Sequence, residues 1–185
     1  MNENPNSVGE QLSFNYTNVQ RPEFKSAIRG MQLITASLML GALSFLFVVM
    51  FTLEPDSDSG PFGLGNPSVI TLAGVAFGVL IAVSHFVVPG IIASAKLKQA
   101  CANQFMEKDE SSKQQVLIGI YRTHLIVGLA LLEGAAFFNL IALMLGKNVL
   151  SWCAFCILFC FLLSSIPTRD KFSFWVQDKL REMSL

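Results

Sequence analysis

The segment from Leu125 to Gly146 reads LIVGLALLEGAAFFNLIALMLG, and it decides the fold class. It is long enough to cross roughly 30 Å of hydrocarbon at about 1.5 Å per residue. Its single charged residue is Glu133. A carboxylate at that depth is costly to bury, so Glu133 is the first candidate for a functional site. The segment therefore predicts a membrane-spanning helix with a polar group near its centre.

The composition extends this prediction to the whole chain. Apolar residues make up 52% of the sequence, charged residues 14%, and the mean hydropathy is +0.54. These values favour an integral membrane protein over a soluble domain. We expect an all-α fold, a membrane-embedded four-helix bundle that forms one domain over residues 21–185. Its predicted spans are residues 31–53, 68–95, 124–146 and 149–166. Residues 1–20, rich in Asn, Ser and Gln, predict a disordered cytoplasmic arm.

The basic residues predict the orientation of these spans. Twelve of the thirteen Lys and Arg residues fall on one side of the predicted spans, and only Lys147 falls on the other. Because basic residues near span ends stay in the cytoplasm, both termini are expected there. No basic surface beyond this pattern indicates nucleic-acid binding. The expected partner is the lipid bilayer, and a protein partner or a homo-oligomer stays open.

A second polar residue falls at the depth of Glu133. Glu133 lies eleven residues after Arg122, and His85 lies eleven residues before Lys96, so each is roughly 16 Å from the cytoplasmic boundary. We therefore expect Glu133 and His85 to form an intramembrane polar pair. Such a pair either satisfies two buried groups structurally or handles protons or ions. Other polar side chains that could contact Glu133 are Asn139, Ser84 and Ser44.

Two further patterns bear on helix packing. Pro89 within the second span predicts a bend, because proline removes a hydrogen bond inside the helix. A fixed bend that shapes the bundle is favoured over the alternative, a functional hinge. An internal similarity aligns Phe45 with Phe137 and places Gly41 opposite Glu133. Apolar helices produce such matches by chance, so the similarity does not predict a duplicated transporter. Small residues spaced four apart predict close helix packing: Gly74, Gly78 and Ala82; Ser37 and Gly41; Ala130 and Gly134.

The C-terminal segment, about residues 169–183, predicts an interfacial amphipathic helix. Phe172, Trp175 and Val176 fall on one side of this helix. We expect Trp175, Arg169 and Lys171 to anchor it at the membrane interface. The alternative is a surface that docks a soluble partner.

Two resemblances centre on Glu133. The string LLEGAAFFNLIA from Leu131 to Ala142, together with Pro167–Arg169 and Trp175, resembles a family of uncharacterised four-span proteins of planctomycete-type bacteria. That resemblance implies a multi-pass protein of the bacterial cytoplasmic (inner) membrane and carries no activity. The shorter string GLALLE, residues 128–133, is similar to the outer helix of rotary ATPase proteolipid subunits. This second resemblance implies an ion-binding carboxylate at Glu133.

The fourth span contains Cys153, Cys156 and Cys160, in the pattern C-x-x-C-x-x-x-C at its outer end. A C-x-x-C pair there resembles quinone-linked disulfide oxidases of the vitamin K epoxide reductase type. The resemblance implies thiol–disulfide exchange at Cys153 and Cys156. The outer loop, residues 51–67, contains no partner cysteine. The alternative is that these cysteines act as small apolar residues.

No other pattern predicts catalysis or a cofactor. The sequence contains no phosphate loop, no H-E-x-x-H and no nucleophile elbow. Three thiols on one straight helix cannot surround a tetrahedral ion, so no metal site is expected. The sequence therefore favours a structural or accessory membrane component over an enzyme.

Overall fold

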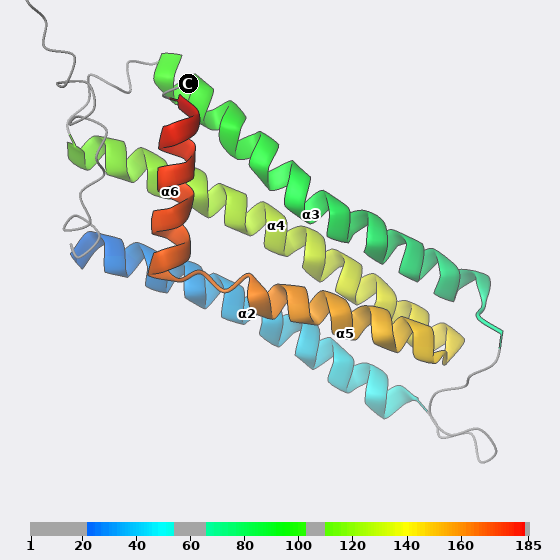
Figure 1. The fold of residues 1–185 in the computed structure, drawn as a ribbon. Helices are drawn as coiled ribbons and strands as arrows, with labels where there is room; N and C mark the ends of the chain where they lie inside the picture. Colours follow the sequence, from blue (N-terminus) through cyan, green and yellow to red (C-terminus); the bar gives the residue numbers. More distant parts are fainter. Residues whose placement is uncertain (1–21, 54–65, 103–109, 184–185) are drawn as a thin grey trace, which may run out of the picture. The chain divides into compact units, whose positions relative to one another are not determined.

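The computed structural model describes residues 22–53, 66–102 and 110–183. Over these residues the chain is all-helical, which confirms the predicted secondary-structure class (Figure 1). The described helices are α2 (Pro22–Thr52), α3 (Val69–Ala102), α4 (Glu110–Gly146), α5 (Val149–Ser164) and α6 (Arg169–Met183). The predicted disordered arm, residues 1–20, lies outside the described residues.

Three of these helices are long and apolar enough to cross a membrane. They contribute residues 25–52, 69–100 and 115–146, and a fourth crossing is counted only if α5 and α6 together form one bent span. Helix α5 has 16 residues, which is about 24 Å of helix. It is shorter than the predicted span over residues 149–166. The helix stops early because Ser165 closes its last turn and Pro167 disfavours helical backbone at Ile166.

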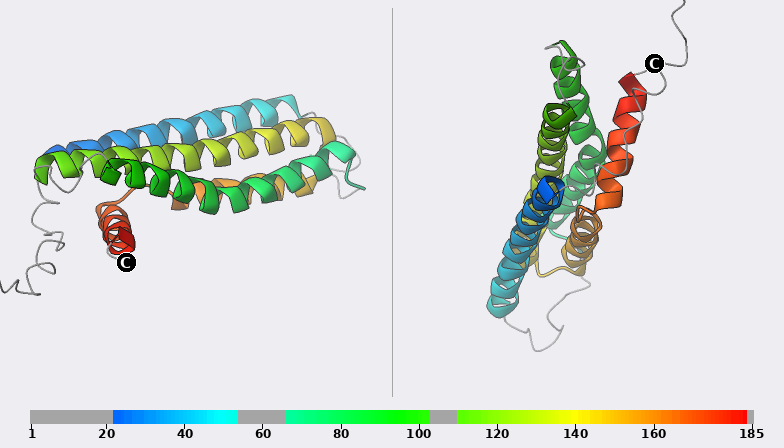
Figure 2. Two further views of the ribbon diagram at one scale, coloured as in Figure 1. Left: turned by 90° about the horizontal axis from the view of Figure 1, so that it is seen from above. Right: turned by 90° about the vertical axis from the view of Figure 1, so that its left-hand side faces the viewer.

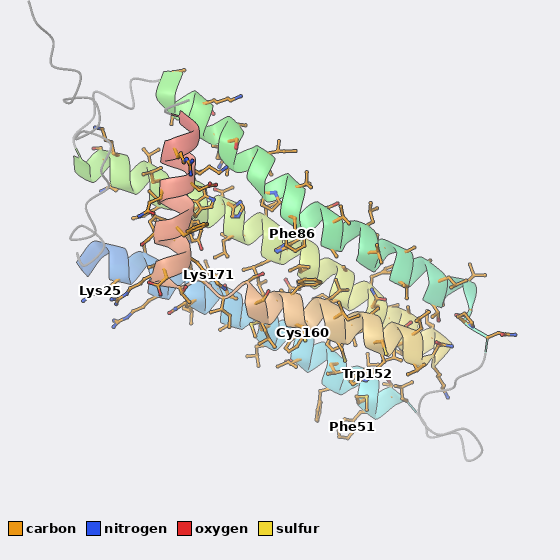
Figure 3. The ribbon with its side chains drawn as sticks, viewed as in Figure 1. Lys25, Phe51, Phe86, Trp152, Cys160 and Lys171 are labelled. Carbon is orange, nitrogen blue, oxygen red and sulfur yellow. The ribbon has the colours of Figure 1, made fainter. Side chains whose placement is uncertain are left out.

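The described chain separates into two compact units, and the larger one is Leu33–Ile166. Within it α4 is the central helix, with α2 on one side and α3 and α5 on the other (Figure 2). Half of the most apolar window of α4 is buried, compared with 17% in α2 and 11% in α3. Large apolar side chains of the outer helices, such as Phe51 and Phe86, stay exposed (Figure 3).

A tight turn joins α4 to α5. Lys147 adopts a left-handed backbone with φ of 43°, and its N–H donates to the Leu143 carbonyl at 2.8 Å. Asn148 then caps α5, because its Oδ1 accepts a hydrogen bond from the Leu150 N–H at 2.9 Å. Only these two residues separate the helices, so α5 folds back antiparallel along α4.

The described part of the smaller unit combines residues 22–32 with residues 167–183. Within it the Gln32 side-chain amide donates a hydrogen bond to the Pro167 carbonyl at 3.0 Å, which ties α2 to the start of α6. Phe172 and Val176 of α6 are buried in the protein, whereas Phe174 is 75% exposed. Protein therefore covers two residues of the apolar face that the sequence assigned to lipid.

Gly146, at the end of α4, packs tightly against the start of α3 and the residue before it. A Cβ atom there would lie 2.6 Å from Thr71 Oγ1 and 3.0 Å from Ser68 Oγ. These two hydroxyls are hydrogen-bonded to each other at 3.0 Å, and Thr71 is fully buried. The position therefore has no room for a side chain.

Gly146→Ala should lower the free energy of unfolding by about 1–3 kcal/mol, because Thr71 must move to admit the methyl group. Unfolding in detergent micelles, followed by the loss of helical signal, measures this effect. Gly119→Ala on the same helix is the matched control, since a Cβ atom there meets nothing within 4 Å. Equal stability of the two variants would contradict the close packing at Gly146.

Candidate functional site

His85 of α3 contacts the backbone of α4 at Gly128. Its Nδ1 lies 3.1 Å from the Gly128 carbonyl oxygen, so the ring donates this hydrogen bond from a protonated Nδ1. A Cβ atom at Gly128 would lie 3.1 Å from the imidazole and 3.4 Å from Cγ of Pro89. Glycine at this position therefore lets both the imidazole and the predicted proline bend of α3 pack against α4. Figure 2 shows α3 curved along its length.

Asn139 forms the most buried polar contact between the same two helices. Its side-chain amide donates to the Gly74 carbonyl of α3 at 3.0 Å and to the Ala135 carbonyl of its own helix at 2.9 Å. A Cβ atom at Gly74 or Gly78 would lie 3.2 or 3.1 Å from this amide. The side chain is 0% exposed. Asn139 therefore joins α4 to the glycine face of α3, which the small-residue spacing predicted to pack closely.

Glu133 points toward α2 and contacts neither of these groups. Its Oε1 would lie 3.3 Å from a Cβ atom placed on Gly41. One turn further along, Phe45 and Phe137 pack edge to face with ring centroids 5.2 Å apart. The side chain is only partly buried. Within the part of the chain that the structure describes, no hydrogen bond or ion pair reaches this carboxylate.

The structure does not bring Glu133 and His85 together. Five residues separate Glu133 from Gly128, which turns their side-chain directions about 140° apart around α4. His85 contacts the face of α4 at Gly128, and Glu133 occupies the face toward α2. Two of the other predicted partners are engaged elsewhere: Asn139 bonds to the Gly74 and Ala135 carbonyls, and the Ser84 hydroxyl bonds to the Leu80 carbonyl of its own helix. The third, Ser44, is exposed and makes no hydrogen bond within the described residues.

Sequence reasoning did not identify Gly128 and Gly146 as contact positions. Both lie opposite polar side chains of α3, and they fall on the same face of α4 as Asn139. A helical wheel of α4 would have revealed this shared face. It could not have shown which neighbouring helix the face contacts.

The three cysteines of the fourth predicted span lie on the outward side of α5. Cys153 and Cys160 are exposed, Cys156 is intermediate, and all three are free thiols. The buried side of this helix carries Ser151, Phe155, Leu158 and Leu162 instead. In the described residues, no group of three or more His, Cys, Asp or Glu side chains is arranged to hold a metal ion.

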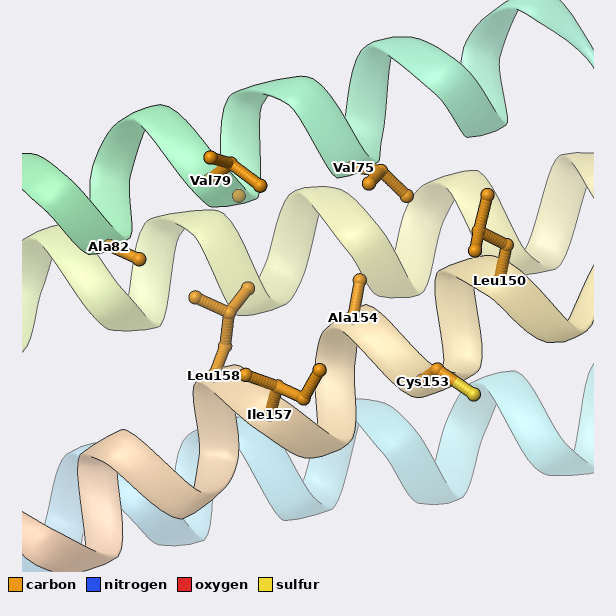
Figure 4. A pocket seen from close by; sticks show the side chains of 9 residues that line it. Val75, Val79, Ala82, Leu150, Cys153, Ala154, Ile157 and Leu158 are labelled. Atoms are coloured by element: carbon orange, nitrogen blue, oxygen red, sulfur yellow. The ribbon is translucent and has the colours of Figure 1, made fainter.

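A small apolar pocket lies between α3 and α5 (Figure 4). Its volume is about 160 Å³, and Cys153 is at its border with Val75, Gly78 and Leu158 among the lining residues. Pockets that enclose a drug-sized ligand usually exceed about 300 Å³ and present several polar groups. This pocket is smaller and more apolar than such sites.

The predicted interface anchors all lie on or beside the surface of α6. Arg169 and Lys171 are exposed. Trp175 is partly buried, and its ring lies 6.3 Å from the ring of Phe172. Their role at a membrane surface stays a prediction.

Comparison of the chain with protein families, with curated proteins and with solved structures found no match. The proposed function therefore rests on the contacts and exposed surfaces of the described residues.

Asn139→Ala should lower the free energy of unfolding by about 1–2 kcal/mol, because α3 and α4 lose a buried interhelical hydrogen bond. Ser84→Ala should change it by less than about 0.5 kcal/mol, since the Ser84 hydroxyl contacts only its own helix. Detergent-micelle unfolding of the two variants measures the difference. If Ser84→Ala lowered the free energy of unfolding as much as Asn139→Ala, the hydrogen bond from Asn139 to Gly74 would not be a specific link between the helices.

Proposed function

We propose that the chain is a multi-pass protein of a bacterial cytoplasmic membrane, in which α2, α3, α4 and α5 cross the bilayer as a four-helix bundle. The apolar outer surface carries this proposal. Large apolar side chains on α2 and α3 stay exposed: Leu33, Leu40, Phe47, Phe51, Val79, Leu80, Val83 and Phe86. A surface of this kind is suited to lipid and not to water. Helix α5, at about 24 Å, spans a locally thinned bilayer.

The orientation follows from the distribution of charge. Lys96, Lys98 and Arg122 lie at one end of α3 and α4, and Lys147 lies at the other end of α4. By the positive-inside rule, both termini are cytoplasmic and the segment of residues 54–65 is outside. Helix α6 then lies at the cytoplasmic side, where Arg169 and Lys171 face anionic lipid.

Reporter fusions test this topology. Alkaline phosphatase inserted after Ser57 should be active, because the enzyme folds only outside the cytoplasm. A fluorescent protein fused after Leu185 should fluoresce, because it folds in the cytoplasm. Phosphatase activity from the C-terminal fusion would overturn the proposed orientation. Recovery of the chain in the soluble fraction would overturn the membrane assignment itself.

We further propose that the protein is a structural or accessory component of a membrane assembly. His85 of α3 and Asn139 of α4 each donate a hydrogen bond to a backbone carbonyl of the other helix, and these two bonds hold α3 against α4. Polar groups that join helices in this way stabilise a bundle. Glu133 differs from them, because it lies at the α2–α4 seam with no partner in the described residues. An accessory component that binds another membrane protein would use Glu133 in that contact.

Proton or ion handling at Glu133 is the second candidate, and the same unpaired carboxylate favours it. Proteoliposomes distinguish the two functions. For an accessory component, wild-type protein and the Glu133→Gln variant should show equal proton flux, no greater than that of empty vesicles. A flux that requires wild-type Glu133, at equal amounts of folded protein, would favour proton handling and contradict the accessory role.

A further inference from the structure

Over residues 33–51, the exposed surface of α2 is apolar except for a polar strip beside Glu133. Ser37, Gly41 and Ser44 follow one another at spacings of four and three residues, so they share one side of α2. Ser37 and Ser44 are exposed, and Gly41 is next to the Glu133 carboxylate. We call Ser37, Gly41, Ser44 and Glu133 the seam strip. It lies among exposed apolar side chains such as Leu40 and Phe47.

The small side chains of the seam strip permit close approach by another helix. Small residues four apart let helix backbones come together in lipid, where no hydrophobic drive favours association. The Ser37 hydroxyl donates to the Leu33 carbonyl of its own helix at 2.9 Å, whereas Ser44 makes no hydrogen bond within the described residues. The strip therefore offers a shallow surface with an available hydroxyl and a carboxylate.

The carboxylate requires compensation that the described chain does not provide. Transfer of an unpaired acidic group into hydrocarbon costs several kcal/mol or more. By contrast, His85 and the Asn139 amide nitrogen each donate a hydrogen bond to a carbonyl of the neighbouring helix. Glu133 has no such bond, although Gly41 leaves room beside it.

A second copy of this chain cannot supply the missing cation. No Lys or Arg occurs in residues 33–53, 68–95, 123–146 or 148–166. A copy docked at the same depth would bring only another Glu133, and His85 is held on a different face of α4. A cation that pairs with Glu133 at this depth would therefore belong to a different polypeptide.

We propose that the seam strip docks a transmembrane helix of a different protein, one that carries a Lys or Arg at the depth of Glu133. This inference rests on the proposed accessory role and names the chemistry of the partner. The basic group pairs with the carboxylate, while the strip of serine and glycine admits the partner backbone. The ion pair is favourable because either charge alone in hydrocarbon would have a much higher free energy.

A designed peptide tests the charge requirement. The full-length protein is reconstituted in phosphatidylcholine vesicles with a labelled Leu/Ala transmembrane peptide that carries one central Lys, or Leu at that position. Energy transfer between labels should show the Lys peptide binding about tenfold more tightly than the Leu peptide, which corresponds to about 1.4 kcal/mol. Equal binding of the two peptides to wild-type protein would overturn the proposal.

Variants then locate the binding site. Glu133→Gln and Ser44→Phe should each abolish the preference for the Lys peptide, one by removing the charge and the other by blocking the strip. Glu133→Asp should retain part of it. Val83→Phe, on the exposed face of α3, is the matched control and should leave the preference unchanged. A preference that persists in Glu133→Gln would place the site elsewhere and overturn the proposal.

Two further readouts separate the possible failures. Vesicle flotation, done first, detects a chain that does not insert, so failure of the membrane assignment is seen before any peptide is added. Energy transfer between two labelled copies of the protein measures self-association. Self-association that requires Glu133 would identify a second copy as the occupant and would overturn the proposal of a different partner.

Discussion

The bundle depends on one recurring contact, a polar side chain placed against a glycine of the neighbouring helix. His85 lies against Gly128, and Asn139 lies against Gly74 and Gly78. Glu133 lies against Gly41 in the same way. Glycine matters here for two reasons: it leaves space for the polar head, and it exposes a backbone carbonyl that can accept a hydrogen bond. Between apolar helices in lipid, such contacts fix rotation and register where hydrophobic burial cannot.

Neither the level nor the direction at which these polar residues contact a neighbouring helix could be predicted from the sequence. The His85 ring bonds to Gly128, which lies five residues, or about 7.5 Å of helix, before Glu133. Counting from flanking charges placed His85 and Glu133 at the same level, because helical rise is constant at about 1.5 Å per residue. Whether two side chains meet also depends on how each helix is rotated. That rotation is set by the fit of Gly128 to His85 and of Gly74 to Asn139, which are pairwise properties of two helices. The helices themselves followed from the long apolar runs, and α5 alone was shorter than expected because of the turn before Pro167.

The internal similarity between the first and third apolar segments gains a physical meaning from the packing of α2 on α4. The alignment that matches Phe45 with Phe137 places Gly41 at the position of Glu133. In the structure these same pairs are in contact, because Phe45 packs on Phe137 and Gly41 faces Glu133. Two parallel helices that touch at equivalent positions are related locally by a two-fold axis along their length. A carboxylate opposite its own copy would be repelled in such a pair, so glycine at one of the two positions makes the contact possible.

Helix α6 illustrates a limit of periodicity as evidence. An apolar stripe identifies the side of a helix that avoids water, but it does not distinguish lipid from protein as the covering. Phe172 and Val176, two residues of the predicted apolar stripe, are buried in the protein. The exposed aromatic side chain is Phe174, which lies outside the predicted stripe. Any membrane contact of α6 must therefore use its outward face, where Phe174 is flanked by Asp170, Lys171 and Asp178. Because charges of both signs surround Phe174, this face attracts anionic lipid less strongly than the basic residues of α6 alone would suggest.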